Sequence, residues 1–132
     1  KIFVIRKGVS VMETQSQTEL NCVVELFNEG WNLLLTLEGM PLTSANAVRR
    51  QQNQIERFKV RAGKSLKKIG MEILDFSGEI YTPELPVSVI NLGDFKSSDE
   101  LRILKMKKLT IKRVGSAEVI QNGVAIVEKY LK

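Results

Sequence analysis

The side chains that most often perform chemistry are nearly absent from this chain. It contains no histidine and one cysteine, Cys22, so a Ser-His-Asp triad, a Cys-His pair and a Cys/His zinc site are all excluded. Leu20, Val23 and Val24 surround Cys22 in the sequence, and this apolar setting predicts a buried, unreactive thiol. Because one cysteine cannot form a disulfide framework within the chain, we expect a reducing compartment and a cytoplasmic location.

The acidic residues do not form a catalytic or metal-binding pattern. Glu79 and Glu84 are close enough in sequence to act as an acid–base pair, but their neighbours do not predict burial, and solvated turn residues are the simpler interpretation. Asp94, Asp99 and Glu100 lack the dense spacing of a calcium loop. The glycines stand singly, so there is no phosphate loop. We therefore expect a protein that is not an enzyme and has no cofactor or metal.

The charged residues form blocks of one sign. Residues 45–70 contain eight Lys or Arg and one acid, residues 71–100 contain seven acids and one base, and residues 101–113 contain six bases and no acid. Such blocks indicate charged faces that meet a partner or one another. The basic blocks could also bind a phosphate backbone. However, Phe58 is the only aromatic residue in them, so they lack the aromatic side chains on which nucleic-acid bases usually stack. Nucleic-acid binding therefore remains an alternative to protein binding.

The elements that would position these charged residues are predicted to be helices in the first half of the chain. Residues 2–12 alternate loosely and are rich in β-branched residues, which predicts a strand-like arm; with the following polar stretch it forms an N-terminal arm and linker over residues 1–17. Thr18 is the expected N-cap of the first helix. Apolar residues at helical spacing then predict a helical hairpin over residues 18–70, with a short turn at Gly39–Thr43 and Thr43 or Ser44 as the second N-cap. Within this hairpin, Phe27 and Trp31 are expected in the core, and the basic residues of the second helix, Lys59 among them, are expected on a solvated face. Such a hairpin buries too little surface alone, so it must pack on the β part or on a second copy of the chain.

The second half of the chain has the pattern of strands, and we call residues 71–132 the β-wing. The strands Met71–Phe76 and Glu79–Tyr81 are expected to pair across a Ser-Gly turn. Leu101–Val114 is expected to be a single strand with one solvent-exposed face. Asn122-Gly123 lies between β-forming residues and predicts a tight type I′ hairpin. The expected fold is therefore α+β, a helical hairpin or bundle followed by a small, mainly antiparallel β-wing. No apolar run reaches the ~18 residues that a membrane span needs, so no membrane partner is expected.

The helical hairpin and the segment after it, over roughly residues 24–127, resemble the GrpE family of nucleotide exchange factors, and the stretch from Leu66 to Val89 carries most of the resemblance. That family has a helix ending in Leu-x-x-x-Gly, then an Asp, a Gly, an aromatic-Asp-Pro corner and a closing β-wing. The matching residues here are Leu66–Gly70, Asp75, Gly78 and Tyr81–Pro83, and Val119–Val127 looks like the last hairpin of the wing. The chain departs from the family at Pro86, Ser88 and Gln121, where His, Ala and Arg are usual, and the strand-like residues 1–12 are expected to replace the long N-terminal helix.

The resemblance implies a mechanical function. A GrpE-like exchange factor binds the nucleotide-binding domain of a DnaK-type chaperone and favours its open state, so that ADP leaves faster. Contacts of the family's wing fall on Gln121, Asn122 and Val124 of this sequence. The expected partner-binding residues of the helical face are Arg57, Arg61 and Lys64. A homodimer through the helices is also expected, and a protein-interaction module without exchange activity is the alternative.

Overall fold

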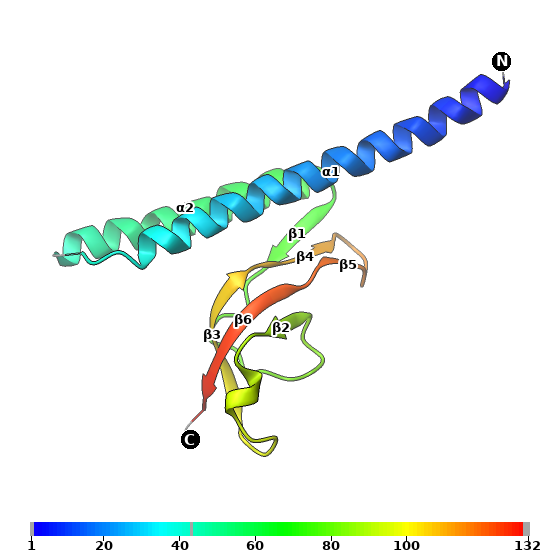
Figure 1. Ribbon diagram of the computed structural model, residues 1–132. Coiled ribbons are helices and arrows are strands. Elements are labelled where there is room, and N and C mark those ends of the chain that lie inside the picture. The colour runs from blue at the N-terminus through cyan, green and yellow to red at the C-terminus, as the bar shows by residue number, and fades with distance from the viewer. Residues whose placement is uncertain (1, 43, 131–132) are drawn as a thin grey trace. The chain divides into compact units, whose positions relative to one another are not determined.

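The computed structural model describes the backbone of residues 2–42 and 44–130, and the side chains of residues 17–42 and 44–130. Helices come first and strands follow, which confirms the α+β fold with a helical hairpin before a mainly antiparallel β part (Figure 1). The chain divides into two compact units, Lys1–Gly30 and Trp31–Lys132. The elements are α1 Ile2–Glu38, α2 Ala45–Lys67, β1 Met71–Leu74, β2 Val87–Val89, the 3-10 helix η1 Leu92–Asp94, β3 Leu101–Lys108, β4 Thr110–Arg113, β5 Val119–Gln121 and β6 Gly123–Lys129.

The predicted strand-like arm over residues 1–17 is wrong, because α1 begins at Ile2 and continues to Glu38. Thr18 accordingly lies inside α1 and is not its N-cap. β-Branched residues favour strands only weakly, and Gly8 costs a helix about 1 kcal/mol. The first proline of the chain is Pro41, so no residue before it forces the helix to end. The expectation that the chain lacks a long N-terminal helix is therefore wrong as well.

In the second unit, the end of α1 and α2 form an antiparallel hairpin. The Ser44 hydroxyl accepts a hydrogen bond from the Ala47 amide at 3.0 Å, so Ser44 is the N-cap of α2, as expected. The rings of Trp31 and Phe58 stack with centroids 6.5 Å apart, and the Gln51 side chain donates to the Leu37 carbonyl. Trp31 is buried, in agreement with its predicted core position.

The junction between α2 and β1 depends on Gly70, whose φ is +81°. This left-handed conformation suits glycine, and it turns the chain from the helix into a strand within a few residues. Met71 follows and is fully buried. The Gly70 carbonyl accepts from the Val114 amide at 2.9 Å, so the junction is tied to the end of β4.

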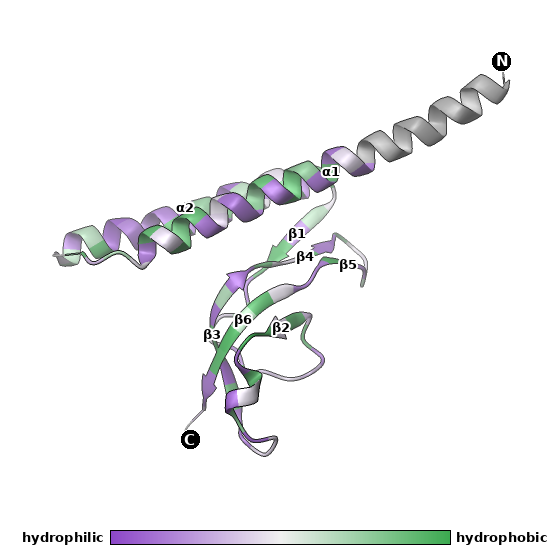
Figure 2. Cartoon of the chain, in the orientation of Figure 1, coloured by the Kyte–Doolittle hydropathy of each residue, from purple (hydrophilic) through white to green (hydrophobic). Residues whose placement is uncertain are grey.

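The strands form two three-stranded sheets, in the orders β1-β4-β5 and β2-β6-β3. All pairs are antiparallel except β2 with β6. The core of this region lies mainly on the central strands, and Figure 2 shows β6 as mostly hydrophobic. Its fully or almost fully buried side chains are Met71, Ile103, Met106, Leu109, Ile111, Ala125 and Val127.

The expected hairpin at Asn122-Gly123 is wrong. β5 pairs with β4, whereas β6 pairs with β3 and β2, so the two segments beside Asn122-Gly123 belong to different sheets. Neither residue has a positive φ, which a type I′ turn would require. The actual turn lies at Gly115, where the Arg113 amide donates to the Glu118 carbonyl at 3.0 Å. The chain bends at Asn122 instead of reversing.

The segment Leu101–Val114, which pairs with β5 and β6, also contains a bend. Leu101–Val114 was expected as one strand, but β3 and β4 are separated at Leu109 and enter different sheets. Glu79–Tyr81 does not return along β1; Ile80 forms an isolated bridge with Arg102 of β3. These differences have one cause, since long-range pairing decides which neighbour a short β segment takes and local pattern does not.

Candidate partner-binding surfaces

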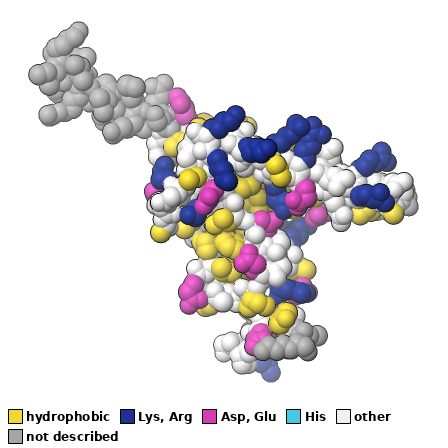
Figure 3. All heavy atoms as spheres, turned by 180° about the vertical axis from the view of Figure 1, so that it is seen from behind, with side chains coloured by type: hydrophobic (Ala, Val, Ile, Leu, Met, Phe, Trp, Pro, Cys, Tyr) yellow, Lys and Arg dark blue, Asp and Glu magenta, His cyan; other side chains and the backbone are white. Residues whose placement is uncertain are grey.

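The expected helical face consists of Arg57, Arg61 and Lys64, and all three side chains are exposed on α2. Their spacing of four and three residues places them on one side of the helix. Within the described part of the chain none of them forms an ion pair. Figure 3, which views the molecule from behind, shows Lys and Arg side chains gathered over the helices. These three cations are therefore available to an acidic partner.

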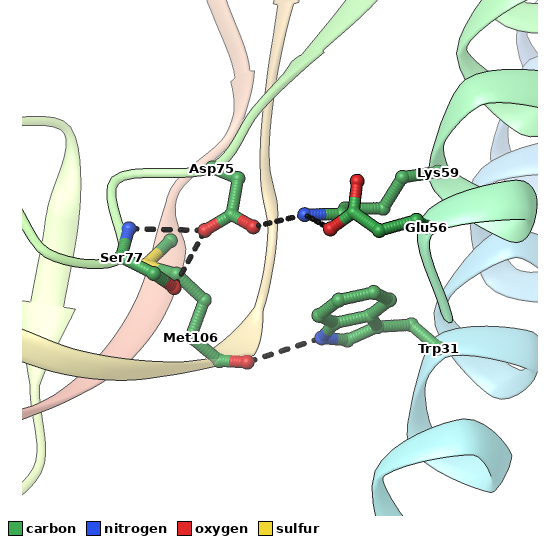
Figure 4. A network of polar contacts seen from close by, with 6 residues as sticks. All are labelled: Trp31, Glu56, Lys59, Asp75, Ser77 and Met106. Carbon is green, nitrogen blue, oxygen red and sulfur yellow. Dashed lines mark hydrogen bonds and ion pairs between the residues drawn. The ribbon is translucent and has the colours of Figure 1, made fainter. Parts of the chain in front are cut away.

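Lys59 was expected on the same solvated face, but the structure places it against the β-wing. Its Nζ lies 2.8 Å from Glu56 Oε1 and 2.9 Å from Asp75 Oδ2 (Figure 4). Burial alone would lower the pKa of Lys59, but the hydrogen bonds and charges of Glu56 and Asp75 outweigh it and raise the pKa above its usual value. Lys59 therefore stays charged and connects α2 to the segment after β1.

Asp75 completes this connection. One carboxylate oxygen accepts from the Ser77 amide at 3.0 Å and from the Ser77 hydroxyl at 2.7 Å, while the other accepts from Lys59. Burial would raise the pKa of Asp75, but the Ser77 hydrogen bonds and Lys59 outweigh it and lower the pKa. Asp75 thus stabilises both the turn that leads to Gly78 and the contact with α2.

Two further contacts hold the end of α1 on β3. The Trp31 indole N–H donates to the Met106 carbonyl at 3.1 Å in a buried position (Figure 4). Lys105 Nζ lies 2.8 Å from Glu38 Oε1. Both helical segments of the second unit are therefore joined to the β-wing by polar contacts as well as by packing.

The expected wing contacts Gln121, Asn122 and Val124 lie at the bend between β5 and β6. Gln121 is half-buried and its side-chain amide donates to the Leu109 carbonyl at 2.9 Å. Gln121 therefore stabilises the bend between β3 and β4. Val124 is half-buried in β6. Asn122 is exposed. The structure thus brings these three residues together at one corner, although not at a hairpin tip, and only Asn122 is fully available to a partner.

The residues considered for chemistry do not form a reactive centre. Glu79 and Glu84 are exposed, in agreement with their interpretation as solvated residues. Within the described residues, no group of three or more potential metal ligands occurs. Cys22 is exposed, so the prediction that it is buried is wrong; it lies on a side of α1 that the local apolar sequence did not reveal.

Comparison with protein-family models, with curated proteins and with solved structures gave no match. No helix among the described residues combines the length and apolar character that crossing a bilayer requires.

Sequence reasoning missed the residues that connect the helices to the β-wing. Lys59 is one of eight bases in its block, and nothing in the local pattern distinguishes it from its neighbours. Trp31 was expected in the core, but its hydrogen-bond partner Met106 is 75 residues away. Only a correct prediction of how the helices pack on the sheets could have found these pairs.

Proposed function

We propose that the chain is a GrpE-like nucleotide exchange factor that binds the nucleotide-binding domain of a DnaK-type chaperone and promotes ADP release. The observation that carries the proposal is the structural role of the residues on which the resemblance rests. Gly70 and Gly78 have φ values of +81° and +86°, and Asp75 binds Ser77 and Lys59. Gly70, Asp75 and Gly78 of the motif therefore determine how the helix leads into the β-wing. This structural role gives a physical reason why the motif and this architecture occur together.

The proposed mechanism needs a stiff connection between helix and wing. An exchange factor speeds ADP release by binding the open chaperone better than the closed one, and the shift is limited by that difference in affinity. The Lys59–Asp75 ion pair and the Trp31–Met106 hydrogen bond support such stiffness in the second unit. A wing held in this way would transmit a force between two contacts without bending.

The first experiment measures release of a fluorescent ADP from a DnaK-type chaperone. We expect the full chain to accelerate release and to bind the nucleotide-free chaperone more tightly than the ADP-bound form. The control is the chaperone mixed with an unrelated protein of similar size and charge. If the chain neither binds the nucleotide-free chaperone nor changes the release rate, the proposal is wrong.

A second experiment tests the helical face. Arg57→Gln, Arg61→Gln and Lys64→Gln together remove three exposed cations while keeping good helix formers, and we expect the acceleration of ADP release to fall about tenfold or more. The matched control is Arg49→Gln, Lys96→Gln and Lys107→Gln, which removes the same charge from other exposed positions. An equal loss in both variants would show that net charge, and not this face, is responsible.

Nucleic-acid binding is the second candidate function, because the exposed row Arg57, Arg61 and Lys64 also suits a phosphate backbone. A mobility-shift titration with DNA and with RNA at several salt concentrations tests it. Binding that weakens steeply with salt, and that the triple Gln variant loses, would favour this function. No shift at low salt would eliminate it.

A further inference from the structure

Asn122-Gly123, at the bend between β5 and β6, is the only Asn-Gly pair in the chain. In such a pair the glycine backbone nitrogen attacks the side-chain amide carbon of the asparagine, since glycine has no β-carbon to hinder the approach. A C–N bond closes a five-membered succinimide ring, and the side-chain NH2 leaves with the backbone amide proton as ammonia. Water then opens the ring at either carbonyl carbon and gives aspartate or isoaspartate. This chemistry needs no enzyme.

The fold requires glycine at this place for a reason of packing. A β-carbon on Gly123 would lie 2.5 Å from Met106 Cε and from Thr110 Oγ1, so a larger residue would overpack the bend. The preceding Asn122 is exposed, and its side chain makes no hydrogen bond within the described residues. The packing therefore keeps an unhindered backbone nitrogen directly after an asparagine whose side chain is free to react.

The attacking nitrogen is protected in the folded chain. Gly123 is buried, and its amide nitrogen donates to the Pro86 carbonyl at 3.0 Å and to the Thr110 hydroxyl at 3.0 Å. Thr110 is fully buried, and its hydroxyl donates to the same Pro86 carbonyl at 2.9 Å. Ring closure requires the Gly123 nitrogen to give up its proton and both hydrogen bonds. The bend must therefore open before the reaction takes place.

We propose that Asn122 is a deamidation site controlled by the hydrogen bonds among Pro86, Thr110 and Gly123, and that it reacts only when the bend between β5 and β6 is open. Both products add a negative charge at this corner, and isoaspartate also lengthens the backbone by one carbon. The longer backbone no longer fits the register that pairs Val87 with Gly123, so the reaction makes a transient local opening permanent. The proposal does not depend on nucleotide exchange.

The test measures the rate of deamidation at Asn122 in the full chain at mildly alkaline pH, by mass spectrometry of its proteolytic peptides. The reference is the same chain unfolded in guanidinium chloride, where the Gly123 nitrogen is no longer protected. We expect the folded chain to react at least about tenfold more slowly, because only the rarely populated open state reacts. Equal rates in the folded and the unfolded chain would overturn the proposal.

A variant at Thr110 tests the control by hydrogen bonds. Thr110→Val nearly keeps the shape of the side chain and removes the oxygen that accepts from Gly123, so we expect the folded variant to deamidate at Asn122 about threefold faster or more. Thr82→Val is the matched control, since Thr82 is exposed and its side chain makes no hydrogen bond within the described residues. An unchanged rate in Thr110→Val, or an equal increase in Thr82→Val, would overturn the proposal.

A second variant separates local opening from unfolding of the whole chain. Leu101 is buried and pairs with Lys129 at the far end of β6, so Leu101→Val destabilises the sheet away from the bend. We expect it to deamidate at Asn122 at the rate of the unmodified chain, and circular dichroism confirms that each variant is folded. If Leu101→Val and Thr110→Val are accelerated equally, the reaction proceeds through global unfolding, and the proposed control by the bend is wrong.

Discussion

The ion pair between Asp75 and Lys59 connects the β-wing to α2. The pair is about three-quarters buried on both sides, so water screens it less than it screens the exposed pairs. Asp75 also binds the Ser77 amide and hydroxyl. Removing its charge therefore affects the turn and the ion pair together, and Lys59 would keep only Glu56 as a charged partner.

We predict that Asp75→Asn lowers the free energy of unfolding at pH 7 by about 1–3 kcal/mol. The folded pKa of Asp75 is depressed, so its contribution is present above the unfolded pKa of about 3.9 and is lost as pH falls through the folded value. The variant should lack that part of the acid dependence. Urea unfolding measured from pH 7 to about pH 2 checks both effects.

The control for this prediction is Glu84→Gln, because Glu84 is exposed and its side chain makes no hydrogen bond within the described residues. It should unfold like the unmodified protein at every pH. The same loss of acid dependence in both variants would contradict the assigned role of Asp75.

At the scale of elements, the decisive feature is the double bend of the strands. β3 and β4 pass from one sheet to the other at Leu109, and β5 and β6 do so at Asn122. Thr110 is fully buried between them; its hydroxyl donates to the Pro86 carbonyl at 2.9 Å and accepts from the Gly123 amide at 3.0 Å. The two bends are thus fastened to each other and to the start of β2.

Gly123 is required at this bend for space and not for its φ. A β-carbon there would lie 2.5 Å from Met106 Cε and from Thr110 Oγ1, and 2.9 Å from the Lys108 carbonyl oxygen. We predict that Gly123→Ala destabilises the fold by about 2–3 kcal/mol or more, because the backbone carbonyl cannot move aside without disturbing the ladder. Thermal unfolding followed by circular dichroism measures the change.

Gly93→Ala is the matched control for this change. Nothing lies within 4 Å of a β-carbon at Gly93, and its φ is not positive, so its stability should change by less than about 1 kcal/mol. If both variants were equally stable, the close approach at Gly123 would not constrain the fold.

For the molecule as a whole, the exposed apolar side chains of α1 indicate a surface through which the expected homodimer could form. In the second unit, Leu33 and Leu37 are 61% and 39% exposed. They are four residues apart and lie on one side of the helix. In the first unit, Val23 and Leu26 are exposed as well. Exposed leucines at such spacing suit helix-to-helix association with a second copy.

We predict that the unmodified chain forms a dimer and that Leu33→Lys with Leu37→Lys weakens self-association at least about tenfold, because the substitutions place charges in an apolar contact. Sedimentation equilibrium measures the mass of both proteins. Asn32→Lys with Thr36→Lys adds the same charge at exposed neighbouring positions and should leave the dimer intact. A monomeric unmodified chain across the micromolar range would show that these leucines do not mediate a dimer.

Features that depend on neighbours along the chain could be predicted from the amino-acid sequence alone. The helical hairpin, an N-cap at Thr43 or Ser44, the core position of Trp31 and the order of helices before strands were all predicted, because periodicity, capping and glycine conformation act over a few residues. The amino-acid sequence also located the exposed row Arg57, Arg61 and Lys64.

Which distant segments meet could not be predicted from local sequence and is seen only in the folded chain. The strand-like pattern of residues 2–12 and the Asn122-Gly123 pair both suggested β structure that other contacts override, since helix continuation and sheet partners are chosen by the whole fold. The Lys59–Asp75 pair and the close packing at Gly123 both join residues that are far apart in the chain. Local sequence preferences carry no information about such pairs, because those preferences act between neighbours and not across the fold.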